Sequence, residues 1–193
     1  MYDNRRINIA LENNMSKPKS KIPYLEVIPR LNGFGFVVIP LNDKKPILKQ
    51  WNKLLKTPEH FYIFENRNIG ILTGHVSGIT VLDIDIKDDG LKIWSNISSS
   101  YPDIVTPMVK TPSGGIHLYF RYNKNLHSFS RFKLRGHSIG WDLLNNERQV
   151  VAPPSMNYIT KKKYKWLLSP VTTSIESMPK WLEDYLMNAK SFR

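Results

Sequence analysis

The chain has 193 residues, of which 41% are hydrophobic, and it contains no cysteine. This length suits one globular domain or two small packed lobes, and the lack of cysteine excludes disulfides and cysteine-ligated zinc. Lysine and arginine number 28 against 16 acids, a net charge of +12, which favours a polyanionic partner such as nucleic acid. A basic composition inherited from an AT-rich genome is the alternative.

Nothing in the chain predicts export or membrane insertion. The first residues lack the apolar core of a signal peptide, and no later stretch approaches the roughly 18 uncharged apolar residues of a span. We therefore expect a soluble intracellular protein of the cytoplasm or nucleoid, with no membrane partner. Residues 1–22 are polar and basic and predict a short helix or a flexible arm, and residues 188–193 predict a C-terminal tail.

The N-terminal third of the chain predicts short elements. Tyr24 begins a predicted helical turn, and after a glycine break a strand is predicted from Gly35 to Pro40. Residues 49–67 predict a helix and a connection. NIGILTG, residues 68–74, predicts a second short buried strand that ends in a turn.

Residues 78–86, GITVLDIDI, predict a largely buried strand. Asp83 and Asp85 interrupt this apolar run two residues apart, so in a strand their side chains project to the same face. Two carboxylates held side by side are costly, because burial penalises each charge and the charges repel each other. A cation must offset this cost, either a divalent metal such as Mg²⁺ or Mn²⁺ or, as the alternative, a basic side chain.

A second informative stretch, VKTPSGGIHLYFRY, combines a turn with a strand. Residues 112–115 are typical turn residues, and residues 116–122 alternate as a strand with the apolar side chains toward the core. His117 is therefore expected on the polar face of the sheet, where the preceding glycines would let phosphates approach closely. A solvated or core histidine is the alternative.

A third candidate strand, IGWDLL, carries Asp142 among apolar neighbours, as the first carries Asp83 and Asp85. RQVVAPPS, residues 148–155, predicts another strand that ends at two prolines. MPKWL, residues 178–182, begins a predicted amphipathic helix at the C-terminus.

The segment between the second and third strands is strongly basic. It has no acid, and Tyr122, Phe129 and Phe132 lie between its cations. Aromatic rings stack on bases while cations follow phosphates, so the segment predicts contact with a single-stranded nucleic-acid template. A solvated loop is the alternative. The basic residues of this predicted template-binding segment are Arg121, Lys124, Arg131, Lys133 and Arg135.

If the acid-bearing strands are neighbours in one sheet, Asp83, Asp85 and Asp142 converge with a histidine. Three carboxylates suit a two-metal phosphoryl-transfer site, in which the ions lie about 3.5–4 Å apart. The cations that could then hold a triphosphate without competing for metal are Lys110, Arg135 and Arg148.

The order of these motifs resembles a known family. The Asp-x-Asp pair, then TPSGGIHLYF, then an apolar strand with an acid, then VVAPPS resembles the catalytic domain of bifunctional primase-polymerases, the prim-pol branch of the archaeo-eukaryotic primase superfamily. The Lys45 to Trp51 segment and the closing MPKWL fit too, so the resemblance spans about Leu31 to Leu186. It implies an α+β fold in which a small N-terminal α/β module packs on an RRM-like sheet, together one primase-polymerase catalytic unit over residues 23–187.

The resemblance also implies an activity. It implies metal-dependent nucleotidyl transfer, with template-directed primer synthesis or DNA polymerisation in replication, from NTPs or dNTPs. Asp83, Asp85 and Asp142 would bind two Mg²⁺ or Mn²⁺ ions. The residues expected at the incoming nucleotide are His117, Ser113, Gly114, Gly115, Lys110 and Arg148.

The chain departs from the family pattern in three ways. Gly115 stands two residues before His117, where relatives often have serine, and the nearest serine is Ser113. No zinc-binding insertion of the usual kind is expected, because the chain has no cysteine. Many relatives continue into a helicase domain, so a helicase is an expected partner, in cis in a longer chain or in trans, and a virus or plasmid is a plausible source.

Two other functions stay open at this point. A metal-dependent nuclease would use the same acids and histidine for phosphodiester hydrolysis. A non-catalytic RRM-like domain would bind single strands by stacking. Clustered carboxylates argue against the second, because they repel phosphate unless a metal intervenes.

Overall fold

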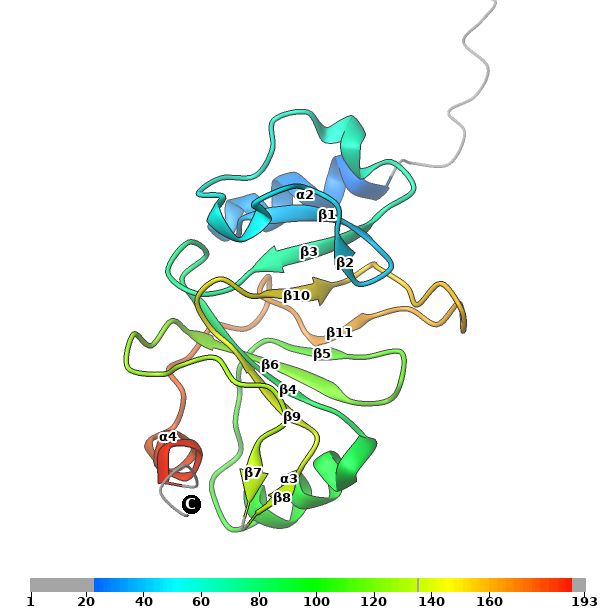
Figure 1. Cartoon of the computed structure of the whole chain (residues 1–193). Helices are drawn as coiled ribbons and strands as arrows, with labels where there is room; N and C mark the ends of the chain where they lie inside the picture. The colour runs from blue at the N-terminus through cyan, green and yellow to red at the C-terminus, as the bar shows by residue number, and fades with distance from the viewer. Residues whose placement is uncertain (1–22, 135, 189–193) are drawn as a thin grey trace, which may run out of the picture.

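The computed structural model describes residues 23–134 and 136–188, which form stacked layers. Figure 1 shows helix α2 (Pro23–Gly33) above a four-stranded sheet, and a five-stranded sheet below it. Helices α3 (Gly90–Ser98) and α4 (Lys180–Asn188) lie beneath the second sheet. The predicted mixed α+β fold is confirmed.

Three predictions lie outside the described residues. They are the basic arm at residues 1–22, the template contact assigned to Arg135, and the tail from residue 189 onward.

The upper sheet has the order β10-β3-β1-β2, and every neighbouring pair is antiparallel. Every residue of β3 is buried, because α2 covers one face of this sheet and the five-stranded sheet covers the other. A strand buried on both faces needs a continuous apolar run, which NIGIL supplies. The strands of the upper sheet are β1 (Val38–Asn42), β2 (Lys45–Pro46), β3 (Asn68–Leu72) and β10 (Gln149–Ala152).

The five-stranded sheet is also antiparallel, in the order β11-β5-β6-β4-β9. Its central pair, β4 and β6, runs in register over six residues. Its strands are β4 (Ile79–Ile84), β5 (Met108–Lys110), β6 (Ile116–Arg121), β9 (Trp141–Leu144) and β11 (Lys165–Leu168). A separate small hairpin pairs β7 (Lys133–Leu134) with β8 (His137–Ser138).

The five-stranded sheet has one hydrophobic core on each of its two faces. Toward the upper sheet, Val81 and Tyr119 belong to a core that also includes β1, β3 and β10. On the opposite face, Leu118 and Trp141 pack with Leu182 of α4. Alternation along each strand therefore sends odd and even residues into different cores.

The upper sheet is not built by the N-terminal segment alone. Strand β10 follows β9 in the chain but pairs with β3 in the other sheet. The chain therefore crosses between the sheets more than once, so cutting it after β3 would leave the upper sheet without one of its strands.

Two predicted elements need correction. The strand predicted over residues 78–86 is β4, which ends at Ile84, so Asp85 lies just beyond it. Residues 49–67 contain no α-helix, only the 3-10 turns η1 (Trp51–Lys53) and η2 (Phe61–Phe64). Between these turns, the Thr57 hydroxyl donates to Asn32 Oδ1 and accepts the amide hydrogen of Val38, which ties the segment to α2 and β1.

Two predicted surface residues are buried instead. His117 is only 4% exposed, because the upper sheet covers the face of β6 that carries it. Phe132, predicted as a platform for bases, is 3% exposed and packs in the core beside α4, with Phe129 against it. Phe132 therefore does not serve as a platform for bases, whereas Tyr122 and Phe129 are partly exposed.

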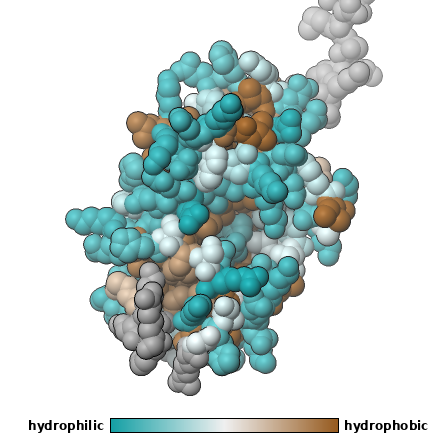
Figure 2. All heavy atoms as spheres, in the orientation of Figure 1, coloured by the Kyte–Doolittle hydropathy of each residue, from teal (hydrophilic) through white to brown (hydrophobic). Residues whose placement is uncertain are grey.

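Hydrophilic side chains cover most of the face drawn in Figure 2, and apolar side chains show on it in small groups. Within the described ranges, no helix combines the length and apolar character needed to cross a membrane.

Candidate active site

Three predicted site residues come from adjacent strands at the same level of the five-stranded sheet. On β4, Asp83 lies directly opposite His117 of β6 and, on its other side, directly opposite Asp142 of β9. Directly opposed residues project to the same face, with neighbouring strands about 4.8 Å apart. The pairing register therefore brings two carboxylates and an imidazole side by side.

Asp85 joins this group from just beyond the end of β4. The Asp85 amide donates to Gly140 O at 2.7 Å, and its carboxylate accepts the amide hydrogen of Ile86 at 3.0 Å. Two glycines let the backbone approach closely here. A Cβ on Gly115 would lie 2.5 Å from Ile84 O, and one on Gly90 would lie 2.3 Å from Asp85 O, so neither position tolerates a side chain without a backbone shift.

The acids and the histidine face a cavity of about 200 Å³ between the two sheets. The five-stranded sheet and its loops supply Asp83, Asp85 and Asp142. The upper sheet supplies Gln149 from β10 and Lys44 from the β1–β2 turn. The remaining lining residues are Thr111, Ser113, His117, Leu144, Val150, Val151 and Tyr164.

The cavity favours neutral forms of both central groups. Burial raises the pKa of Asp83 to about 7, helped by the nearby charges of Asp142 and Asp85 and opposed by Lys44. Burial also lowers the pKa of His117 to about 3, and Lys44 lowers it further. The imidazole is therefore neutral near pH 7. His117 Nε2 lies 3.6 Å from Asp83 Oδ1, which is too long for a hydrogen bond, so the two groups do not form a charged pair.

A hydrogen bond orients the third acid, Asp142, whereas one ring nitrogen of His117 has no hydrogen-bond partner among the described residues. Asp142 Oδ1 accepts the backbone amide hydrogen of Arg131 at 2.7 Å, which leaves its second oxygen available. The Nδ1 atom of His117 is buried and has no hydrogen-bond partner among the described residues. An unpaired buried nitrogen is costly unless water or a ligand satisfies it.

The donor set of the cavity fits a hard divalent cation. Within the described residues, no three acidic or histidine side chains are close enough together to form a ready metal cage. Three carboxylates facing one cavity are nevertheless the oxygen donors that Mg²⁺ and Mn²⁺ prefer. Burial and the charges of Asp142 and Asp85 raise the pKa of Asp83, and a bound divalent cation would favour its ionised form.

The turn before β6 lies at the edge of the cavity. Two internal hydrogen bonds close it, since the Thr111 amide donates to Gly115 O and the Gly114 amide donates to Thr111 O. The hydroxyls of Thr111 and Ser113 lie 2.9 Å apart, and both residues line the cavity. Of the predicted nucleotide contacts, His117 and this turn are therefore next to the acids.

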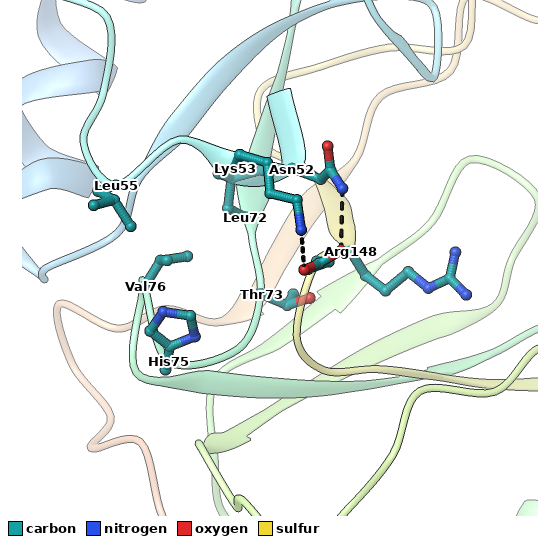
Figure 3. Close-up of a pocket in the computed structure, with 9 residues that line it drawn as sticks. Asn52, Lys53, Leu55, Leu72, Thr73, His75, Val76 and Arg148 are labelled. Carbon is teal, nitrogen blue, oxygen red and sulfur yellow. Dashed lines mark hydrogen bonds and ion pairs between the residues drawn. The ribbon is translucent and has the colours of Figure 1, made fainter. Parts of the chain in front are cut away.

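Two other predicted nucleotide contacts lie elsewhere. Lys110 on β5 pairs with Ile116, so its side chain projects from the opposite face of the sheet. Arg148 lines a second cavity of about 110 Å³, drawn in Figure 3, and its guanidinium points away from the other labelled side chains. In that cavity, Lys53 forms an ion pair with Glu147 at 2.5 Å.

Four cations of the predicted template-binding segment are exposed, and one of them already forms a hydrogen bond within the protein. Lys124, Arg131 and Lys133 are all exposed. Arg121 is exposed as well, but its Nε donates to Ile175 O at 2.8 Å. These four cations therefore remain accessible, whereas Phe132 between them is buried and Phe129 is partly buried.

Four polar cavity residues were not predicted from the sequence: Lys44, Thr111, Gln149 and Tyr164. Thr111 sits inside the turn motif and could have been included with it. Lys44 and Gln149 come from the other sheet, and no local pattern links them to the acids.

Comparison with known proteins identifies one family. A family model described as "Bifunctional DNA primase/polymerase, N-terminal" matches residues 30–181. No curated protein matches the chain.

Proposed function

Because the chain belongs to the family of bifunctional DNA primase/polymerase N-terminal domains, we propose that it makes primers and polymerises DNA by metal-dependent nucleotidyl transfer in replication. The family supports nucleotidyl transfer in general. One observation supports placing the reaction in the cavity between the sheets. Asp83 lies between His117 and Asp142 across three paired strands, facing that cavity.

Asp83, Asp85 and Asp142 would hold two Mg²⁺ or Mn²⁺ ions in this proposal. Bound ions there would polarise the reacting phosphate and activate the attacking hydroxyl. The chain's own contribution is positioning, because the register of β4 with β9 sets the spacing of two of the carboxylates. The backbone amide of Arg131 fixes the orientation of one of these two carboxylates, Asp142.

His117 and the preceding turn would contact the phosphates of an incoming NTP or dNTP. A neutral imidazole donates one hydrogen bond without adding positive charge beside the metal-binding acids. The Ser113 hydroxyl, at the cavity edge, could add a second hydrogen bond. Gly114 and Gly115 have no side chain, so a phosphate can come close to the backbone of the turn. Lys110 and Arg148 stay predictions, since neither lines the cavity.

The exposed cations of the template-binding segment would hold a single-stranded template beside the cavity. Lys124, Arg131 and Lys133 are accessible for this contact, and Arg121 can contribute through its outer nitrogens. A helicase, in a longer chain or as a separate protein, would supply the single strand.

The test is synthesis on a circular single-stranded DNA without primer. The full chain is incubated with this template, Mg²⁺ or Mn²⁺, and labelled NTPs and dNTPs, and the products are separated by length. We expect short products that lengthen with time and disappear when EDTA is added. The same assay with a primed template separates extension from initiation.

Other outcomes would contradict the proposal. A shortened template with no labelled product would indicate a nuclease. Template binding with no product, and no change on Asp83→Asn, would indicate a non-catalytic binder. A nuclease would account for the three carboxylates around one cavity but not for the family match, and a non-catalytic binder accounts for neither.

A further inference from the structure

Lys44 is the one lysine or arginine among the described residues that line the acidic cavity. It lies in the turn between β1 and β2 of the upper sheet, across the cavity from the acids of the lower sheet. Its charge acts at the centre of the site, because it lowers the pKa of both Asp83 and His117. The two walls of the cavity therefore carry opposite charge.

The turn that carries Lys44 is held in place from three directions. Asp43 O accepts from Asn68 Nδ2 of β3 at 2.8 Å, and Asp43 Oδ1 accepts the amide hydrogen of Tyr158 at 3.2 Å. The carbonyl oxygen of Lys44 itself accepts from Gln149 Nε2 of β10 at 3.0 Å. This anchoring fixes the position of the Lys44 backbone while its side chain stays exposed.

Among the residues that the structure describes, the Lys44 ammonium has no hydrogen-bond or ion-pair partner. No carboxylate in the described part of the chain lies within 4 Å of it. An exposed lysine without a partner is ordinary on a surface, but this one projects from an anchored turn into a cavity lined by three acids. An anionic ligand bound between the walls would meet it.

Building on the proposed function, we propose that Lys44 binds the phosphates of the incoming nucleotide from the wall opposite the metal-binding acids. Gln149 is the positioning residue that holds the Lys44 turn at the cavity. A triphosphate carries more negative charge than its own metal contacts neutralise, and a lysine supplies a mobile point charge for the remainder. The upper sheet thereby contributes directly to substrate binding, in addition to covering the lower sheet.

The hairpin offers a matched control. Lys45 is the next residue, is also exposed, and does not line the cavity. The test compares the full wild-type chain with Lys44→Met, Lys44→Arg and Lys45→Met in extension of a primed single-stranded template. Three quantities are measured for each: the KM for dNTP, kcat, and the affinity for template without nucleotide.

We expect Lys44→Met to raise the dNTP KM at least about tenfold, the loss typical of one charge-assisted hydrogen bond. Lys44→Arg should restore most of this loss, and Lys45→Met should match wild type. Template affinity should not change in any variant. Inhibition by inorganic pyrophosphate should weaken in Lys44→Met by a similar factor, because the same contact would be lost.

Gln149→Leu tests the positioning role with the lysine charge intact. It should raise the dNTP KM by roughly threefold and leave kcat unchanged, because a freer turn holds the ammonium less often at the phosphate. An effect on kcat alone would assign Gln149 to packing instead.

The proposal fails if Lys44→Met and Lys45→Met have the same KM, or if Lys44→Met weakens template binding and not nucleotide binding. Thermal melting establishes that each variant folds, and Lys44→Gln replaces Lys44→Met if the latter does not. If the wild-type chain extends no primer, the proposed function fails. Lys44 is then still tested by titrating dATP and Mn²⁺ into wild type and both lysine variants, where equal affinities would overturn its role.

Discussion

The two faces of the five-stranded sheet differ in how their buried polar groups are satisfied. On the face toward α3 and α4, Trp141 Nε1 donates to Gly90 O, and the Thr80 hydroxyl bonds to Asn145. On the face toward the upper sheet, His117 Nδ1 and the Tyr119 hydroxyl are buried with no hydrogen-bond partner in the described chain. The described part of the protein supplies hydrogen-bond partners for the polar groups named on the first face, but not for those on the second.

The two faces therefore differ in role: one stabilises the fold, and the other suits the binding of a ligand or metal. A fully satisfied, close-packed face contributes free energy of folding. A face with unpaired polar groups and like charges costs free energy, and it persists where a ligand or metal completes it. Burial, followed by the charge of Asp83, also raises the pKa of Tyr119, so this phenol stays protonated near the site. Substitutions on the two faces should therefore have opposite effects on activity and stability.

The largest expected effect is the loss of activity on Asp142→Asn. The amide keeps an oxygen that can accept the hydrogen bond from Arg131, so the fold should be preserved while a charged metal ligand is lost. We expect synthesis to fall by about 10²–10³-fold or more, the range found when a group that stabilises transition-state charge is removed. Steady-state primer extension measures this loss, and melting tests the fold. Asp103→Asn, at an exposed loop acid, is the control and should match wild type.

The opposite face should show the opposite pattern. Leu182 of α4 is fully buried against the sheet, so Leu182→Ala removes packing and leaves a cavity. We expect a loss of about 2–5 kcal/mol in the free energy of unfolding, measured with urea, while the molecules that remain folded keep their activity. Leu167→Ala makes the same change at a leucine that is 52% exposed and should cost far less. Equal losses at the two leucines would contradict the packing described for α4.

The pH dependence of the free energy of unfolding should show the cost of placing Asp83 on the face toward the upper sheet. The pKa of Asp83 is about 7 in the folded protein, above its usual value, so the folded state holds this proton more tightly than the unfolded chain. The stability that this proton contributes is present below about pH 4 and is lost as the pH rises to 7. Asp83→Asn has no such proton to lose. Its stability relative to wild type in EDTA should therefore increase from pH 4 to 7 and stay constant above.

The gain for Asp83→Asn at pH 7.5 should be about 2 kcal/mol, roughly half that of a fully buried carboxyl, because a third of the side chain is exposed. Added Mg²⁺ or Mn²⁺ should raise the melting temperature of wild type and not that of the variant. The lowered pKa of His117 acts in both proteins and cancels in the comparison. A constant difference across the pH range would show that Asp83 is not destabilised by its surroundings.

The smallest expected effect is that of a substitution in the template-binding segment, away from both faces of the five-stranded sheet. Lys133→Ala should weaken binding of single-stranded template modestly and reduce the slope of log affinity against log salt by up to about 0.7, the value for one phosphate contact. Fluorescence anisotropy across a salt series measures both quantities. Lys56→Ala, far along the chain and paired with Glu59, is the control. If both variants keep the wild-type slope, Lys133 does not lie on the template path.

Local sequence was sufficient to find the acids and the histidine. Asp83 and Asp142 interrupt apolar runs, and an isolated charge in a strand predicts a site without knowledge of how the strands pair. The same patterns placed β3, β6 and β10 close to their observed bounds, because β-branched runs between turn residues report on backbone geometry over a few residues. The order of the motifs indicated the family, which the match over residues 30–181 confirms.

Tertiary structure alone decided which residues share the cavity and which faces are covered. Gln149 reaches the acids because β10 crosses into the upper sheet, and Lys44 reaches them from the β1–β2 turn of that sheet. Arg148, one residue before Gln149, is turned to a different cavity. Alternation along β6 separates His117 from its apolar neighbours but is the same whether that face meets water or another sheet. Pairing between distant strands determines these features, since burial and charge act through space and leave no periodic signal in the chain.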